Sequence, residues 1–98
     1  QWTYAGMGLE HSERPPHNIQ ELGGVQELLQ VWVNTPAQYK MEQPQYIPLS
    51  KEDTPTITTP DGKVTLLIPA GHLHGVQGKI PTYTPVTTIM GHMQQGGT

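Results

Sequence analysis

Apolar and polar positions alternate along this chain in short runs, and no window keeps the helical spacing of apolar residues for three full turns. Residues 26–34 carry the clearest run, because strand-forming side chains occupy both of its alternating faces. Residues 63–68 form a second run, composed mostly of β-branched residues and Leu. The pattern predicts extended segments at residues 1–4, 9–13, 26–34, 45–49, 63–68, 79–83 and 86–93.

Glycine and proline separate these runs. There are 11 Gly and 10 Pro among 98 residues, about twice the average share of roughly 12%. They predict loops at residues 15–24 and 69–78 and a turn at residues 60–62. Residues 35–40 begin with Thr-Pro, which is typical of a helix start, and residues 50–53 resemble a capped turn. Short strands at this turn spacing predict an all-β sandwich or barrel.

Composition limits how much core the chain can build. Only 34% of its residues are hydrophobic and Phe is absent, and a chain this short buries a small share of its surface. We therefore expect it not to fold as a self-sufficient unit. It also opens on Gln1-Trp2 rather than on Met and ends in a turn-like sequence, so we expect a piece of a longer protein.

Charge and residue usage exclude several classes of function. The net charge is −3 with only five Lys and Arg, which argues against direct contact with nucleic acid. The absence of cysteine excludes a disulfide framework and thiolate chemistry. No apolar run approaches the roughly 18 residues of a membrane helix, and no signal peptide opens the chain. A cytoplasmic location is the expectation.

The pair His11 and Glu13 is the sharpest candidate site. In a strand, positions i and i+2 point to the same face, so the imidazole and the carboxylate should project side by side into one concavity. Such a mixed donor set suits a first-row divalent metal, including non-haem iron. The alternative is a weak surface ion pair beside Arg14, because H-x-E is a short pattern with many chance matches.

A second histidine pair, His72 and His74, competes for the same role. Both residues lie between glycines at positions 71 and 75, so a regular strand is not expected and the rings need not share a face. We predict that they lie in an exposed loop away from the His11 pair. His17 and His92 stand alone and are expected to be structural.

Three motifs, in order and at compatible spacing, resemble the pirin-like family. Residues 1–13, QWTYAGMGLEHSE, resemble its Q-W-x-x-A-G-x-G-x-x-H-S/A-E run. Residues 30–34, QVWVN, are similar to its L-Q-L-W-V-N strand, and residues 40–46, KMEQPQY, are similar to its K-M-x-x-P-x-Y segment. Asp61-Gly62 falls where the second cupin barrel of that family begins. The resemblance covers essentially the whole chain.

The resemblance implies an all-β bicupin with a single Fe²⁺ in its amino-terminal barrel. Residues 1–50 would then end that barrel, residues 51–62 would link the two barrels, and residues 63–98 would begin the carboxyl-terminal barrel. Four side chains hold the iron in the family, and the second pair of these falls on His11 and Glu13. The first pair, an H-x-H motif, is expected upstream of this chain.

The function that the resemblance implies is an iron-dependent dioxygenase that opens flavonols such as quercetin, a small aromatic substrate. Glu13 would also be the catalytic proton acceptor from a substrate hydroxyl. One alternative is a non-enzymatic transcriptional co-regulator or redox sensor that acts through a protein partner. Another is a cupin whose metal is purely structural.

Overall fold

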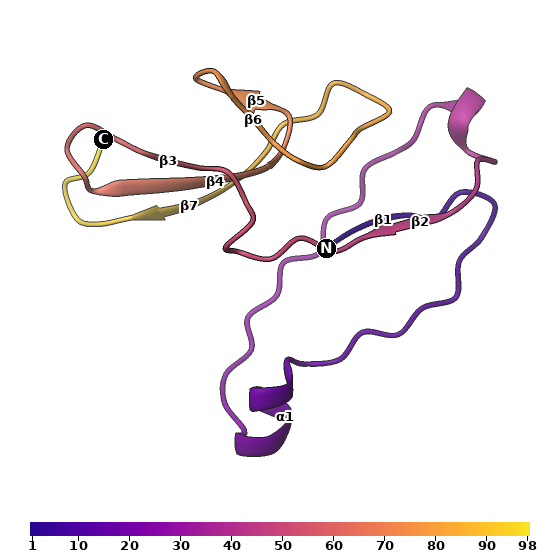
Figure 1. Ribbon diagram of the computed structural model, residues 1–98, viewed down its shortest axis with the longest axis horizontal. Coiled ribbons are helices and arrows are strands. Elements are labelled where there is room, and N and C mark those ends of the chain that lie inside the picture. The colour runs from indigo at the N-terminus through magenta and orange to yellow at the C-terminus, as the bar shows by residue number, and fades with distance from the viewer.

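The computed structural model describes residues 1–98, and its regular elements are mostly short strands, which confirms the predicted all-β class. A three-stranded sheet occupies one end, a two-stranded ribbon the other, and a single short helix projects from the ribbon side (Figure 1). The elements are β1 (Trp2–Tyr4), α1 (His17–Leu22), the 3₁₀-helix η1 (Ala37–Tyr39), β2 (Gln45–Ile47), β3 (Thr56–Thr58), β4 (Val64–Ala70), β5 (His72–Leu73), β6 (Val76–Gln77) and β7 (Thr88–Met93). No helix has the length and apolarity needed to cross a lipid bilayer.

The sheet β3–β4–β7 carries the core. Its strands are antiparallel, with β4 in the middle, and the Asp61-Gly62 turn joins β3 to β4. Asp61 accepts hydrogen bonds from Thr59 Oγ1 and from the backbone N–H groups of Lys63 and Thr98. These bonds, led by that of the Thr59 hydroxyl, hold the pKa of Asp61 below its ordinary value.

Alternating side chains of β4 point into this core, as a period of two residues requires. Val64, Ile68 and Ala70 are buried, while the residues between them are half-buried. Ile80 packs against the same strand and pairs with Ala70 through a single bridge. The fifth buried residue is Thr54, whose hydroxyl donates to the Ser50 carbonyl. The core is therefore small and belongs to the second half of the chain.

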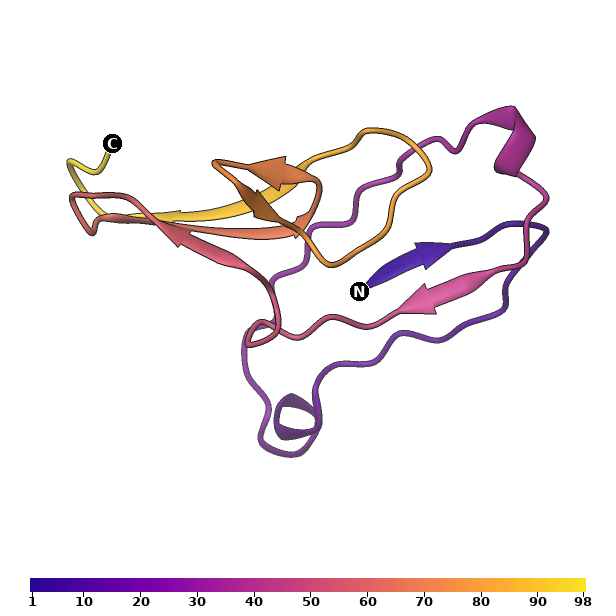
Figure 2. The same ribbon diagram turned by 45° about the horizontal axis from the view of Figure 1, so that its top comes forward.

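Aromatic side chains join the two halves. The loop of residues 78–87 reaches from the sheet toward the β1–β2 ribbon (Figure 2). Tyr83 in this loop packs edge-on against Tyr4 and stacks on Tyr39, with 4.7 Å between ring centroids in both pairs. The Tyr4 hydroxyl donates to the Pro81 carbonyl, and partial burial raises the pKa of Tyr4. Tyr4, Tyr39 and Tyr83 therefore pack together between the two halves.

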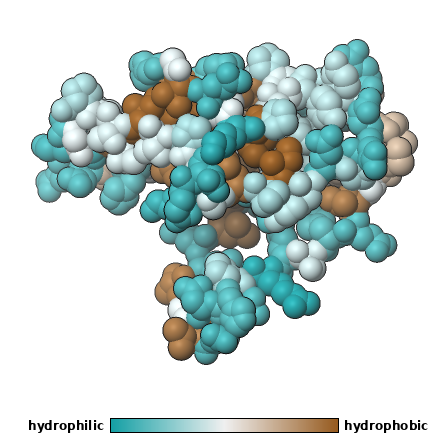
Figure 3. Space-filling model, viewed as in Figure 1, coloured by the Kyte–Doolittle hydropathy of each residue, from teal (hydrophilic) through white to brown (hydrophobic).

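The molecule as a whole is open and flat. Its radius of gyration is 16.0 Å, against about 13 Å for a compact domain of 100 residues. The accessible surface is 7854 Å², whereas a compact protein of this mass exposes about 5,500 Å². Hydrophobic residues accordingly reach the surface, including on the projecting lobe that holds α1 (Figure 3).

Three predicted strands are wrong. Residues 26–34 form no strand and expose their large apolar side chains, with Trp32 at 92%. Residues 9–13 likewise lie outside any strand, and residues 79–83 contribute only the bridge at Ile80. The physical reason is shared: strand-forming residues become a strand only where a neighbouring strand supplies hydrogen bonds.

Two predicted loops contain regular structure instead. Within residues 15–24, α1 begins after Pro16 and ends at Gly23, and the His17 imidazole lies 3.4 Å from the Glu21 carboxylate one turn later. Within residues 69–78, strands β5 and β6 form a short hairpin whose turn contains His74 and Gly75. His74 has a φ of 46° and Gly75 a φ of 78°, the left-handed conformation that such a turn requires.

The remaining predicted elements, including β1 within residues 1–4, are confirmed with different bounds. Residues 45–49 contain β2, residues 63–68 lie largely within β4, and residues 86–93 contain β7. Residues 35–40 contain η1, although Pro36 rather than Thr35 is its capping residue. The turn at residues 50–53 is closed by the Ser50 hydroxyl, which donates to the Asp53 carboxylate and accepts from the Asp53 backbone N–H.

Candidate metal-ligand pair

A tight turn after β1 directs the chain toward the candidate pair. Gly8 N–H donates to the Ala5 carbonyl, and Met7 N–H donates to the Glu42 carbonyl. Gly6 has a φ of 50°, and a Cβ at this position would collide with that same Glu42 oxygen. Glycine is required here because both the left-handed backbone and the close approach exclude a side chain. The turn sends residues 9–16 back beneath the β1–β2 ribbon (Figure 1).

His11 and Glu13 lie side by side in this returning segment. Nε2 of His11 is 3.7 Å from Oε1 of Glu13, and the two side chains are 44% and 41% exposed. The i, i+2 spacing therefore brings the imidazole and the carboxylate together even though no strand forms around them. At this exposure the contact between the two side chains itself contributes little to stability.

Gln1 contacts Glu13 directly and Tyr46 contacts Gln1, and the sequence singled out neither residue. Nε2 of Gln1 donates to Oε1 of Glu13 at 2.8 Å, and Oη of Tyr46 donates to Oε1 of Gln1 at 2.8 Å. Gln1 directly precedes β1 and Tyr46 lies in β2, where it pairs with Thr3. The only available signal was that both residues belong to the motifs that carry the family resemblance.

The other histidines lie elsewhere. His72 is exposed in β5 and His74 is exposed in the following turn, in the hairpin beside the three-stranded sheet (Figure 1). His17 opens α1, and His92 lies opposite Thr65 on β7. No three His, Asp or Glu side chains gather closely enough to hold a metal ion together.

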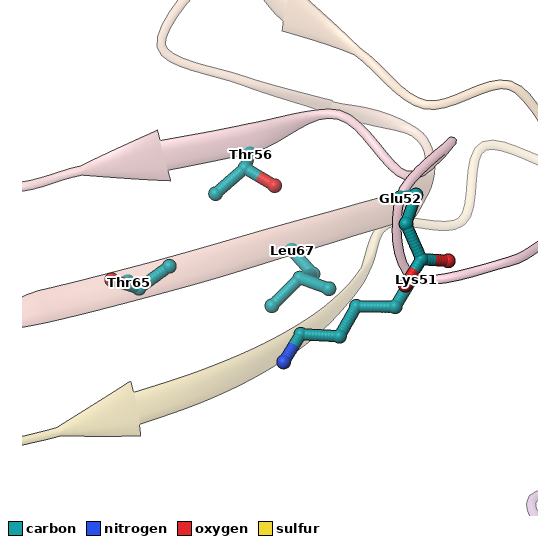
Figure 4. A pocket seen from close by; sticks show the side chains of 5 residues that line it. All are labelled: Lys51, Glu52, Thr56, Thr65 and Leu67. Atoms are coloured by element: carbon teal, nitrogen blue, oxygen red, sulfur yellow. The ribbon is translucent and has the colours of Figure 1, made fainter.

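Two open surface pockets are lined by other residues. One, of about 340 Å³, lies where the turn before β3 meets the sheet and is lined by Lys51, Glu52, Thr56, Thr65 and Leu67 (Figure 4). The other, of about 240 Å³, lies at the aromatic contact between the halves and is lined by Tyr4, Gln45, Pro81, Thr82 and Tyr83. Neither is lined by His11 or Glu13, so a concavity shared by this pair remains a prediction.

The donor chemistry of the pair fits a metal such as iron. A nitrogen and an oxygen bound to one first-row metal at about 2.0–2.2 Å lie roughly 3–4 Å apart, and the observed separation is 3.7 Å. Imidazole and carboxylate are the mixed donors of the non-haem iron sites that keep open positions. The pair can thus provide two ligands, and a complete set needs further donors.

Comparison with known proteins shows that the chain is similar to pirins and pirin-like proteins. No family model matches it, and no solved structure matches it. The chain is 36% identical over 96 residues to pirin of Mus musculus, covering 98% of this chain and 31% of that protein. It is 38% identical over 85 residues to pirin of Homo sapiens, covering 87% of this chain and 27% of that protein.

A bacterial relative extends the same finding. The chain is 35% identical over 86 residues to a Pseudomonas aeruginosa protein whose name provisionally describes it as a quercetin 2,3-dioxygenase. That match covers 88% of this chain and 30% of the relative. The chain is therefore pirin-like, and it spans about 30% of the length of the curated relatives it matches.

Proposed function

We propose that this chain supplies half of an iron site, with His11 and Glu13 as the two ligands, in a quercetin (flavonol) 2,3-dioxygenase-type cupin. The observation that carries the proposal is the 3.7 Å approach of His11 Nε2 to Glu13 Oε1 in a segment whose sequence matches pirin-like proteins. The name of the Pseudomonas aeruginosa relative supports a small aromatic substrate.

The proposed division of labour follows from the two side chains. Bound iron would supply open positions for the substrate oxygens and O₂. The neutral imidazole of His11 offers one nitrogen lone pair, and the exposed Glu13 carboxylate offers two oxygens. Because only Oε1 of Glu13 accepts the Gln1 hydrogen bond, the second oxygen is available to accept a proton from a substrate hydroxyl.

The same proposal divides the chain in two. Residues 1–50 would end an amino-terminal cupin barrel, residues 51–62 would link the barrels, and residues 63–98 would begin the second one. The distribution of burial supports a boundary near residue 50, because no residue before Thr54 is buried. Within residues 51–62, however, β3 pairs with β4, so this segment packs with the second part. A bicupin would supply the strands that cover the first half.

Metal analysis tests the site. We call the long form a chain in which these 98 residues are flanked by the further sequence of a pirin-like protein. The long form is expected to retain about one iron per chain through a chelator wash, and His11→Ala to lose it. His92→Ala is the matched control. His92 lies on β7, away from the proposed ligands, so this variant should keep the iron.

Two results would contradict the proposal. One is an iron content that His11→Ala and Glu13→Gln leave unchanged. The other is stoichiometric, chelator-resistant iron in the isolated 98 residues, because two ligands would then have sufficed. A long form that binds iron but does not oxidise quercetin would favour the non-enzymatic alternative, a redox-dependent interaction protein, over the dioxygenase.

A further inference from the structure

A relay of two hydrogen bonds connects Tyr46 to Glu13 through Gln1. The Tyr46 hydroxyl donates to the Gln1 side-chain oxygen, and the Gln1 side-chain nitrogen donates to Glu13, each at 2.8 Å. The relay spans three separate parts of the chain: the residue before β1, strand β2 and the segment that carries the candidate ligands.

The chemistry of the three groups fixes the direction of the relay. An ionised carboxylate can only accept, so Glu13 requires the NH₂ end of the Gln1 amide. The amide oxygen then faces Tyr46, whose hydroxyl has a proton to donate. A flipped Gln1 amide would place its oxygen against the Glu13 carboxylate, where neither group has a proton to donate, so the contact with Glu13 selects one orientation of the amide.

The relay is also the hydrogen-bonded link between this segment and the ribbon. The backbone of residues 9–14 forms no hydrogen bond, and no strand includes these residues. Apart from its neighbour His11, Glu13 has one polar partner in the structure, and that partner is Gln1. The orientation of the Glu13 carboxylate therefore depends on Gln1, and the orientation of Gln1 depends on Tyr46.

We infer that Gln1 and Tyr46 are positioning residues that hold Glu13 in the orientation in which it binds iron. This inference rests on the proposed function for its metal, while the relay itself does not. Metal-binding carboxylates are themselves hydrogen-bonded, and removing such a partner typically costs 10–100-fold in metal affinity. Tyr46→Phe removes one hydroxyl and keeps the ring, so it isolates this effect.

The first experiment measures iron affinity of the long form by competition with a chelator. Tyr46→Phe is expected to lower Fe²⁺ affinity about tenfold and to change the electron paramagnetic resonance line shape of the ferric form. Gln1→Met, which keeps the length but removes both bonds, should cost at least as much. The double variant should lose no more than Gln1→Met alone, because the two residues act in series.

Tyr39→Phe is the matched control. The Tyr39 ring stacks on Tyr83, and its hydroxyl has no hydrogen-bond partner. This variant should leave affinity and line shape unchanged, and equal thermal unfolding of both Phe variants would exclude a folding defect. Additive losses in the double variant, or equal losses in the two Phe variants, would overturn the inference.

The second experiment needs no metal and separates the two proposals. In the metal-free long form, nuclear Overhauser contacts between the Gln1 side-chain amide and the Glu13 methylene protons are expected, and they should weaken in Tyr46→Phe. Contacts that persist unchanged in Tyr46→Phe would overturn the relay whatever the iron content. A wild-type long form that shows the contacts but binds no iron would instead overturn the proposed function.

Discussion

All five buried residues lie between Thr54 and Ile80, whereas no residue of the first 50 is buried. The first half nevertheless contains His11 and Glu13, and it exposes 10 of the 13 large hydrophobic side chains that reach the surface. One half of the chain therefore carries the packing and the other carries the candidate chemistry. The contrast teaches that ligand spacing can be local, while the environment that makes ligands useful is assembled from distant strands.

Replacing the central core residue should have the largest effect on this contrast. Ile68 is fully buried in β4, and Ile→Ala substitutions in cores cost about 2–5 kcal/mol. Ile68→Ala is therefore expected to destabilise the sheet so far that a urea titration of the chain shows little of its cooperative unfolding transition.

A single chemical change made in both halves sharpens the comparison. Val64 is 4% exposed and Val25 is 94% exposed. Val64→Ala should destabilise the chain measurably, and Val25→Ala should stay within about 0.5 kcal/mol. Equal costs would show that the first half is packed in solution.

Two glycines with nearly equal φ angles allow the cost of backbone strain to be separated from the cost of a steric clash. Gly71 has a φ of 84° and Gly75 a φ of 78°. A Cβ at Gly71 would lie 2.5 Å from the Val86 carbonyl oxygen, while a Cβ at Gly75 would meet nothing within 4 Å. Gly71→Ala is expected to cost about 1–3 kcal/mol more than Gly75→Ala, as measured by thermal unfolding. Identical costs would mean that the close approach of Gly71 to the loop at Val86 is absent.

The contact between the halves should be weaker than the core. Tyr4→Phe removes the hydrogen bond to Pro81 but keeps the ring against Tyr83, and a typical net contribution is about 0.5–1.5 kcal/mol. Tyr39→Phe removes no hydrogen bond and serves as the control. We expect faster amide hydrogen exchange near Tyr83 in Tyr4→Phe only.

The smallest expected effect is a loss of stability in acid that depends on Asp61. The folded chain lowers the pKa of Asp61, so this carboxylate stabilises the β3–β4 turn above its unfolded pKa, about 3.9. That contribution is lost as the pH falls through the folded pKa. The amide resonance of Lys63, which donates to Asp61, should shift in this acidic range. Asp61→Asn should remove the shift, and a shift that persists would exclude Asp61 as its source.

Much of the second half could be predicted from the sequence, because its paired strands are close in sequence and are joined by turns with recognisable turn residues. Residues 63–68 are strand-forming, the Asp61-Gly62 turn precedes them, and β3 lies directly across that turn. The failure at residues 26–34 has the opposite cause. Their alternation is as good, but a strand also needs a partner for its backbone.

The helix α1 and the relay show two other limits. Pro15-Pro16 suggested a loop, although Pro before a helix, an i, i+4 His17–Glu21 pair and Gly23 after it are ordinary helix signals. The spacing of His11 and Glu13 correctly predicted their proximity. Gln1 and Tyr46 are 45 residues apart, and their meeting depends on the β1–β2 register, which no local pattern encodes.

The exposed segment of residues 26–34 also gives the chain a built-in optical reporter. Trp32 in this segment is 92% exposed, whereas Trp2 is half-buried beside Tyr4. A solvated indole emits at longer wavelength than a covered one, so Trp32 dominates the red edge of the fluorescence spectrum. Any strand that covers this segment will shift that emission to the blue and shield it from iodide quenching. In Trp2→Phe, which lacks the second indole, the emission of Trp32 alone then reports in real time when another strand covers residues 26–34.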